Sequence, residues 1–321
     1  MLWKLFTHSK SPCRHSLCAV AAVALSMIGI AAAADLPAAP LMSQPGASTT
    51  DKPQSEKVRL TTKDGVRIVA VYFPAFIKTD KSKKPNPNVG KGIAPVILIH
   101  DWNGRASELF PLASYLQKSK MSVLAIDLRG HGESTTRVVA GQEVKIDRKR
   151  IKNSLMQTAA FDIEAGKVFL KEKNNNKQVN IEMLTVIGTG AGAALALNWA
   201  AMDWNVKPLP NRKQGQDVKA LVLLSPKLIY KGINARAALS HRAMGYGISV
   251  QTISGARSSS NKDADKIYDT LHNSKTEESK ARVVNIELDT NLEGPRILTS
   301  PLGHSTAEHM EKFINARVLK F

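Results

Sequence analysis

A glycine-rich turn at residues 188–192 is the part of the sequence best suited to chemistry on a carbonyl or anionic group. It follows an aliphatic run, residues 184–187, that is typical of a buried strand. It precedes an alanine-rich segment, residues 191–201, that is typical of a helix. The N–H groups at the start of a helix have no partner within the helix and attract negative charge. We therefore expect this turn to bind a carboxylate, ester or phosphate oxygen.

The same turn also fits the spacing of a dinucleotide-binding site, because Gly188, Gly190 and Ala193 form a G-x-G-x-x-A pattern. A site of that kind has an acidic residue about 20 positions later, at the end of the next strand. That strand ends here in Leu-Leu-Ser-Pro at residues 223–226, which contains no acid. An NAD-dependent oxidoreductase is therefore a lower-ranked alternative, and we expect no cofactor.

Two further segments carry a specific resemblance to a known family. Residues 96–104 read Val-Ile-Leu-Ile-His-Asp-Trp-Asn-Gly, and residues 127–134 read Asp-Leu-Arg-Gly-His-Gly-Glu-Ser, with a helical segment between them. Together they resemble the α/β-hydrolase superfamily, in particular its dienelactone-hydrolase-like and serine-aminopeptidase-like branches. The resemblance covers residues 56–321. It implies an α/β-hydrolase fold with a mostly parallel, eight-stranded sheet and helices on both faces.

The resemblance places the family's catalytic nucleophile at Gly190. In such enzymes a serine occupies the centre of a G-x-S-x-G turn. The flanking glycines are present here, but Gly190 has no side chain and cannot form an acyl-enzyme. Thr189 is adjacent and is expected to point elsewhere. The resemblance also implies an oxyanion hole made by the backbone N–H groups of Trp102 and Ala191, which does not require the serine.

The two partners of the nucleophile are also altered. The family's acid follows the next-to-last strand, where this sequence has Ser258. Its histidine follows the last strand, where His304 is the candidate; alternatively, Glu293 and Gly294 occupy the family's His-Gly position and His304 is an ordinary loop residue. The sequence thus predicts a degenerate site that binds a small ester- or carboxylate-like ligand without cleaving it. The alternative is an ester, lactone or peptide hydrolase with a displaced nucleophile or a water activated by His304.

Alternating strand-like and helix-like segments begin at residue 56. Residues 58–61 and 66–73 flank an Asp-Gly turn and predict a hairpin. The alternation that follows predicts a mostly parallel sheet covered by helices. Its strands are expected at 95–100, 123–127, 184–187, 220–224, 249–253 and 283–288, and its helices at 106–118, 154–172, 191–201, 262–272 and 305–318. Residues 133–152 form a basic, irregular insertion, which is either a cap over the sheet or, as we favour, a solvated loop.

The N-terminal segment has the layout of a secretory signal peptide. Residues 1–34 carry three basic residues, then an apolar run at 17–30 and four alanines before Asp35. An uncleaved membrane anchor is the alternative. Residues 35–55 read as a flexible linker. Both cysteines, Cys13 and Cys18, lie in the first segment, so we expect an exported, periplasmic or secreted chain without disulfides or cysteine-bound metal.

The chain is strongly basic, with 45 Lys and Arg against 27 Asp and Glu and a net charge of +18. Cleavage after residue 34 removes three basic residues and no acidic one, which leaves a charge of +15. Neither a nucleic-acid motif nor metal-ligand spacing is present, since His304 and His309 stand apart from other ligands. We therefore expect an acidic envelope polymer or a membrane surface as partner, and no metal or specific nucleic-acid binding.

Overall fold

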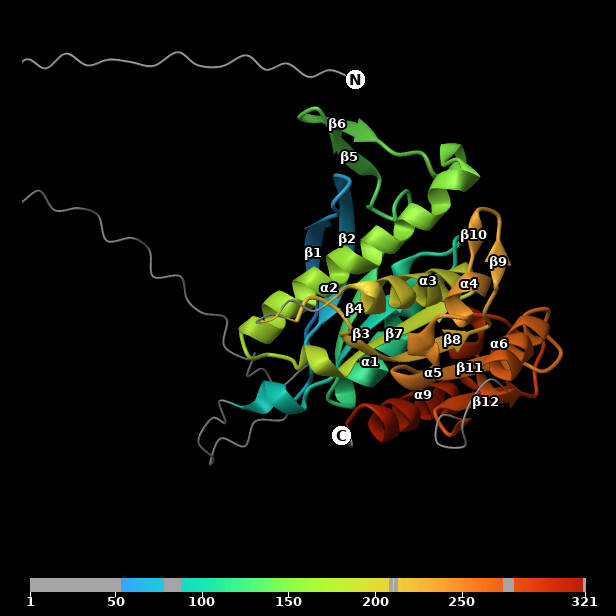
Figure 1. Cartoon of the computed structure of the whole chain (residues 1–321). Coiled ribbons are helices and arrows are strands. Elements are labelled where there is room, and N and C mark those ends of the chain that lie inside the picture. The colour runs from blue at the N-terminus through green and yellow to red at the C-terminus, as the bar shows by residue number, and fades with distance from the viewer. Residues whose placement is uncertain (1–52, 78–87, 208–209, 211–212, 274–279, 320–321) are drawn as a thin grey trace, which may run out of the picture. The chain divides into compact units, whose positions relative to one another are not determined.

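The computed structural model describes residues 53–77, 88–207, 210, 213–273 and 280–319 (Figure 1). The predicted signal peptide, 1–34, and nearly all of the predicted linker, 35–55, lie outside these ranges. Residues 46–321 group into one compact unit by their contacts. Within the described ranges, none of the helices combines the length and the apolar composition needed to cross a bilayer.

The core of this unit is a ten-stranded mixed sheet in the order β12-β11-β8-β7-β3-β4-β2-β5-β6, with β1 paired along the other edge of β2. The six strands β3, β4, β7, β8, β11 and β12 are parallel. The strands are β1 Glu56–Thr61, β2 Val66–Phe73, β3 Pro95–Ile99, β4 Ser122–Ile126, β5 Thr136–Val139, β6 Gln142–Lys145, β7 Leu184–Thr189, β8 Val218–Leu224, β11 Ser249–Gly255 and β12 Val283–Leu288.

Helices cover both faces of the sheet. Successive residues of β3 point to opposite faces, so Ile97 and Ile99 pack under α2, α3 and α6, whereas Val96 and Leu98 pack under α1 and α9. These helices are α1 Phe110–Lys118, α2 Ala160–Asn175, α3 Ala191–Asn205, α6 Asn261–Asn273 and α9 Gly303–Arg317. Short 3-10 turns, η2 Ala106–Leu109 and η4 Asn153–Ala159, lead into α1 and α2. The predicted α/β-hydrolase architecture is confirmed.

Smaller elements complete the fold between and after these helices. The short helices are α4 Arg236–Leu239, α5 Arg242–Tyr246 and α8 Pro295–Leu298, and β9 Ile229–Tyr230 pairs with β10 Ile233–Asn234 in a separate two-stranded sheet. Further 3-10 turns are η1 Val89–Gly92, η3 Arg148–Arg150 and η5 Ile181–Met183. The ends of β3 and β7, with the loops that follow, bring Trp102, Gly190 and Ala191 of the predicted site together.

The predicted count of eight strands is wrong, because part of the 133–152 insertion is regular. Its first half forms the β5–β6 hairpin, closed by Ala140 and Gly141, both at positive φ. Two such residues form a tight hairpin turn that usually contains Asn-Gly or Asp-Gly. Residues 140 and 141 are Ala-Gly, so this signal is absent here. β5 pairs with Val66 and Arg67 of β2, so the hairpin extends the sheet. The insertion is largely exposed, as a solvated segment would be.

Candidate functional site

The glycine turn between β7 and α3 has the geometry that the sequence predicts. Gly190 has φ 55° and ψ −121° and immediately precedes α3. A Cβ atom at Gly188 would lie 2.6 Å from the carbonyl oxygen of Gly192, and one at Gly192 would lie 2.4 Å from that of His100. The small residues therefore let the helix approach the strands closely. The left-handed backbone at Gly190 aims the start of α3 at the end of β3.

The carboxylate of Asp101 occupies the space in front of this turn. Its Oδ1 accepts hydrogen bonds from the backbone N–H groups of Trp102 and Ala191, both at 2.8 Å. These are the two donors expected to form the oxyanion hole, and 2.8 Å is the distance at which such donors hold a reacting oxygen. The two predicted donors thus converge on one oxygen atom, and that atom belongs to a side chain of the same protein.

Asp101 also takes the space of a nucleophile. A Cβ atom at Gly190 would lie 2.4 Å from Cγ of Asp101 and 2.5 Å from its Oδ1. Real Cβ atoms do not approach other heavy atoms so closely, so position 190 has no room for a side chain while Asp101 is in place. The second carboxylate oxygen, Oδ2, is 3.1 Å from Nζ of Lys227. The glycine and the aspartate are therefore complementary in shape, and the lysine balances the carboxylate's charge.

A buried histidine fixes the loop that carries Asp101. The backbone N–H of Leu128 donates to Nε2 of His100 at 3.0 Å, so the proton of the neutral ring lies on Nδ1. Nδ1 lies 2.6 Å from the carbonyl oxygen of Asp101 and donates to it. Burial lowers the pKa of His100 from 6.5 to about 3, which keeps the ring neutral. His131 is held in the same region, with Nε2 against the carbonyl oxygen of Trp102.

The neutral state of His100 predicts acid sensitivity. Between pH 6.5 and about 3 the unfolded chain binds a proton at this residue and the folded chain does not, so stability falls as the pH falls. The slope is about 1.4 kcal/mol per pH unit for one such proton. We expect urea unfolding of His100→Gln to show a shallower pH dependence than wild type, on top of a lower stability at pH 7. His309→Gln, at an exposed position, is the control, and equal slopes for His100→Gln and wild type would contradict this assignment.

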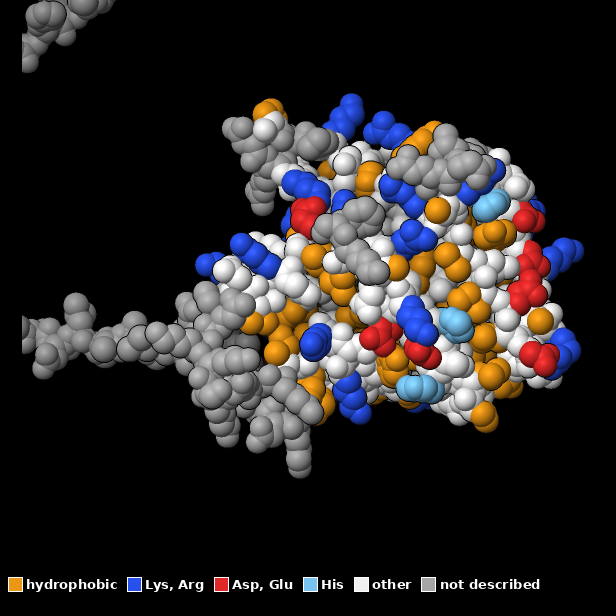
Figure 2. All heavy atoms as spheres, turned by 90° about the horizontal axis from the view of Figure 1, so that it is seen from below, with side chains coloured by type: hydrophobic (Ala, Val, Ile, Leu, Met, Phe, Trp, Pro, Cys, Tyr) orange, Lys and Arg blue, Asp and Glu red, His pale blue; other side chains and the backbone are white. Residues whose placement is uncertain are grey.

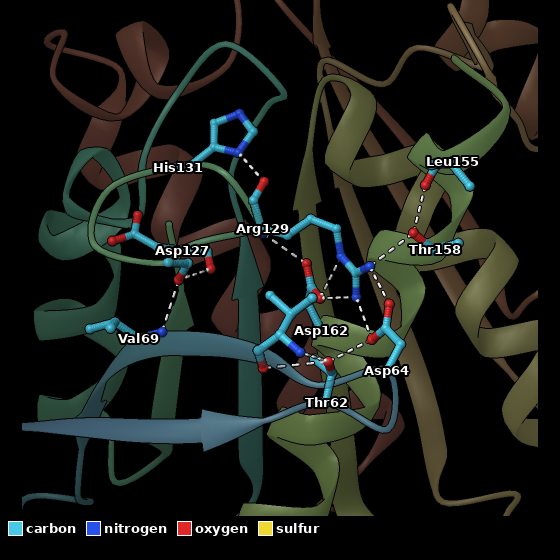
Figure 3. Close-up of polar contacts among 11 residues, drawn as sticks. Thr62, Asp64, Val69, Asp127, Arg129, His131, Leu155, Thr158 and Asp162 are labelled. Carbon is cyan, nitrogen blue, oxygen red and sulfur yellow. Dashed lines mark hydrogen bonds and ion pairs between the residues drawn. The ribbon is translucent and has the colours of Figure 1, made fainter. Parts of the chain in front are cut away.

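A buried ion-pair network anchors the second motif segment (Figure 3). The guanidinium of Arg129 contacts Asp162 of α2 at 2.7 Å and Asp64 of the β1–β2 turn at 2.6 Å, and it donates to Thr158. The backbone N–H of Arg129 also donates to Asp162. Burial raises the pKa of Asp162 to about 6, against the lowering effect of Arg129. Burial also acts to raise the pKa of Asp64, but hydrogen bonds from Arg129 and Thr62 hold it below its ordinary value.

A cavity of about 510 Å³ opens beside Asp101 and Gly190. It is lined by charged side chains of both signs and by small polar residues. The charged ones are Asp101, Glu108, Lys227, Glu293 and Arg296, and the small and polar ones are Asn103, Gly104, Gly190, Ser225, Gly294 and Thr299. A site with this lining suits a small polar molecule.

The loops that follow β11 and β12 meet at Glu293, which lines this cavity. Glu293 accepts hydrogen bonds at Oε1 from the hydroxyl of Ser259, at 2.7 Å, and from the backbone N–H of Ser260, at 3.1 Å. Ser258, at the family's acid position, contacts the hydroxyl of Ser260 at 2.9 Å. A carboxylate held by serines therefore joins the two loops where the family has a histidine held by an acid. This agrees with the alternative in which Glu293 and Gly294 occupy the His-Gly position.

His304 does not line the cavity beside Gly190. It is an exposed residue in the first turn of α9, and its ring makes an edge contact with Tyr115 at 5.5 Å. It lines a separate hollow of about 120 Å³. The expectation that His304 acts on a water in the cavity is therefore not met. Thr189 is buried and donates to the carbonyl oxygen of Ile99, at 3.4 Å, so it too points elsewhere, as expected.

Sequence reasoning missed three residues of this site: Asp101, Ser225 and Lys227. Asp101 lies inside the segment that signalled the family, directly before the first oxyanion donor, and an acid at that place is the signal that could have revealed it. Ser225 and Lys227 follow β8 in a loop without a motif. The dinucleotide alternative gains no support either, because the Asp101 carboxylate fills the helix N-terminus that a phosphate would use.

Many solved structures share this fold, and three of them illustrate the likeness at low sequence identity. An esterase from Pyrococcus furiosus is 17% identical with a TM-score of 0.57, over 83% of this chain and 92% of that one. A carboxylesterase, EstE1, cloned from a metagenomic library, is 14% identical with a TM-score of 0.57, over 83% and 89%. DcsB, in complex with its substrate analogue, is 13% identical with a TM-score of 0.56, over 83% and 100%. At these identities the likeness concerns the fold.

The comparison of the sequence with family models gives a single assignment. The model described as serine aminopeptidase, S33, matches residues 91–283, which is well over half of the chain. The matched range includes both motif segments, the glycine turn, and Arg129 with its partners Thr158 and Asp162. No curated protein matches the sequence. The chain belongs to the serine aminopeptidase S33 family of the α/β-hydrolase superfamily.

Proposed function

We propose that this chain is an exported, non-catalytic member of its family, which binds a small ester- or carboxylate-like ligand in the cavity beside Gly190. One observation carries the proposal. The position of the catalytic serine is a glycine, and the oxyanion hole beside it holds the carboxylate of Asp101. A site without a nucleophile, whose anion donors are already engaged, has lost the means of acyl transfer while keeping a built pocket.

The choice of ligand class follows from what the pocket already binds. Two backbone donors and an ammonium group surround the Asp101 carboxylate, so the site is compatible with a carboxylate in both geometry and charge. Lys227 and Arg296 supply positive charge at the wall of the cavity. An external carboxylate would enter the hole when Asp101 swings out, or it would bind beside Asp101 on these two cations.

Competition between Asp101 and an external carboxylate gives the test. We expect Asp101→Gly to bind acetate or butyrate about 10- to 100-fold more tightly than wild type, because two charge-assisted hydrogen bonds become available to the ligand. Isothermal titration calorimetry of both proteins measures the difference. Asp289→Gly removes one exposed acid elsewhere and controls for the change in net charge. Equal affinities for Asp101→Gly and Asp289→Gly would overturn the assigned ligand class.

The second candidate is a hydrolase with a displaced nucleophile, and Ser225 is the residue that favours it. Ser225 lines the cavity and has φ 47°, a strained backbone for a residue other than glycine. Strain of this kind is found at functional sites. Against this candidate, the described contacts give its hydroxyl only the backbone N–H of Gly294, at 2.8 Å, and no side-chain base. Covalent reaction of Ser225 with a fluorophosphonate would be its signature.

Export is supported by the composition of residues 1–34 and by the absence of cysteine after Cys18. The basic mature chain, at +15, fits an acidic envelope polymer or a membrane surface as a partner.

A further inference from the structure

The end of the molecule that carries the β5–β6 hairpin exposes apolar side chains. The described residues include eight exposed large hydrophobic side chains, and three of them, Val139, Val144 and Leu155, lie within this one segment. They are 44%, 40% and 51% exposed. Single exposed apolar residues need no explanation, but three within 17 positions form a concentration that favours a contact surface.

The register of the hairpin places two of these side chains on one face. Arg137 pairs with Val144, and Val139 pairs with Gln142, in the antiparallel β5–β6 ladder. Paired residues share a face of the sheet, and residues two apart on one strand also share it. Val139, Val144 and the exposed Arg137 therefore project from the same side.

Positive charge follows directly after the hairpin. Residues 145–152 contain five basic residues and one acidic residue, Asp147. Asp147 is engaged locally, because it caps the short turn η3 through the N–H of Lys149 and lies 3.6 Å from Arg150. Lys145, Lys149, Arg150 and Lys152 are exposed. Figure 1 shows the hairpin and the segment leading to α2 together at one end of the molecule.

The opposite end of the molecule also carries basic side chains. Figure 2 views the molecule from that side, where Lys and Arg side chains are spread over the face among hydrophobic ones. The exposed lysines of α1 and α6, Lys118, Lys262 and Lys266, are examples from outside the hairpin end. Cations are thus available in many places, and the hairpin end is marked by three large apolar side chains, each at least 40% exposed, that lie close in the chain to exposed basic residues.

We propose that this surface, residues 137–155, docks the protein on a lipid bilayer that contains anionic headgroups. Lys and Arg near an anionic bilayer each contribute about 1 kcal/mol in electrostatic attraction, and apolar side chains beside them insert at the level of the headgroups. A hydrated acidic polymer would satisfy the cations but would give the valines and Leu155 no apolar environment. The combination of both side-chain types therefore favours the bilayer.

The docking surface is connected to the candidate site. Arg148, which is half-buried, donates to the carbonyl oxygen of Trp102 at 3.4 Å. Ile151 lies against Gly130 in the loop of the Arg129 network, where a Cβ on the glycine would meet its side chain at 3.2 Å. A bilayer bound at residues 137–155 would therefore hold the cavity at a fixed orientation to the membrane. Because Arg148 and Ile151 contact residues near the candidate site, the variants used in the test leave both unchanged.

The test is co-sedimentation of residues 35–321 with vesicles of phosphatidylcholine alone or mixed with phosphatidylglycerol. This form lacks the apolar run at 17–30, which could itself insert into a bilayer. We expect binding to the mixed vesicles only. Lys149→Gln/Arg150→Gln/Lys152→Gln is expected to weaken it about 100-fold. The matched control, Lys118→Gln/Lys262→Gln/Lys266→Gln, should bind within about threefold of wild type, because these charges would lie beyond the reach of screened attraction.

The apolar contribution separates a bilayer from an acidic polymer. Val139→Thr/Val144→Thr keeps side-chain shape and charge, and we expect it to weaken vesicle binding about tenfold. Unchanged binding of this variant would overturn the proposal and point to a polymer that contacts only the cations. Equal losses in the two charge-removing triple variants would also overturn it, because binding would then follow net charge alone. Thermal melts of each variant show that it is folded.

Discussion

Gly190→Ser is expected to lower the free energy of unfolding by about 2–6 kcal/mol. Two costs add at this position. A residue other than glycine at φ 55° and ψ −121° is strained by about 1–3 kcal/mol. In addition, its Cβ would lie 2.4 Å from Cγ of Asp101, and relieving such an overlap costs about 1–3 kcal/mol. Urea unfolding at pH 7 measures the sum.

Gly294 provides a matched control for the first cost. It has nearly the same backbone, φ 55° and ψ −134°, but nothing lies within 4 Å of its Cβ position. Gly294→Ser therefore measures strain alone, and the difference between the two variants measures the collision with Asp101. We expect Asp101→Gly/Gly190→Ser to recover most of that difference. If the double variant were no more stable than Gly190→Ser, Asp101 would not occupy the space in front of the glycine turn.

We do not expect Gly190→Ser alone to give the protein hydrolase activity. Serine at position 190 would displace the Asp101 carboxylate from the two amides, and it would meet Glu293 rather than a histidine across the cavity. A serine hydroxyl without a positioned base is a weak nucleophile. Gly190, the Asp101 carboxylate on the two amides and Glu293 at the cavity are together consistent with the proposed non-catalytic site.

Arg129→Met is expected to cost about 3–5 kcal/mol, because it leaves the fully buried Asp162 without its counter-charge. Asp162 would also lose the side-chain hydrogen bonds that hold α2 against the second motif segment. The control is Arg257→Met, which removes an exposed partner of Asp289 and should stay within about 0.5 kcal/mol of wild type. Chemical unfolding of both variants gives the comparison.

The pH dependence identifies the cause of this loss. Burial already raises the pKa of Asp162, and without Arg129 the folded-state value rises further. Between the unfolded and folded pKa values the folded chain binds a proton that the unfolded chain does not, so stability falls as the pH rises. The cost of Arg129→Met should therefore be smallest near pH 4 and largest above neutrality. Arg129→Met/Asp162→Asn should recover stability at pH 7; no recovery would show that lost packing, not the buried charge, dominates.

The fold could be predicted from the sequence because its strands are buried on both faces. Runs such as residues 95–100 and 184–187 contain little but aliphatic residues, and the intervening helices are marked by their own composition. The family motifs supplied the order of these elements. The β5–β6 hairpin escaped prediction because its turn lacks the usual residues, and its short strands are largely exposed.

The site could be predicted only where backbone groups define it. The donors at Trp102 and Ala191 are implied by the family resemblance, and the structure brings them to one oxygen atom. The sequence shows an acid at position 101, but it does not show that this side chain binds the two donors, because side-chain direction depends on packing around His100 that a motif does not encode. The choice between His304 and Glu293 likewise depended on where the loop after β12 turns, and this is set by tertiary contacts such as that between Gly294 and Ser225.

The most direct measurement of the central claim is the intact mass of the purified chain after exposure to a fluorophosphonate, together with its turnover of p-nitrophenyl acetate. An active serine esterase serves as the positive control. The proposed function predicts an unchanged mass and no turnover above that of the denatured protein, because Ser225 and Thr299, the hydroxyl residues that line the described cavity, contact backbone groups and no side-chain base. A stoichiometric adduct on a cavity residue such as Ser225, accompanied by ester hydrolysis, would contradict the claim that this pocket binds without cleaving.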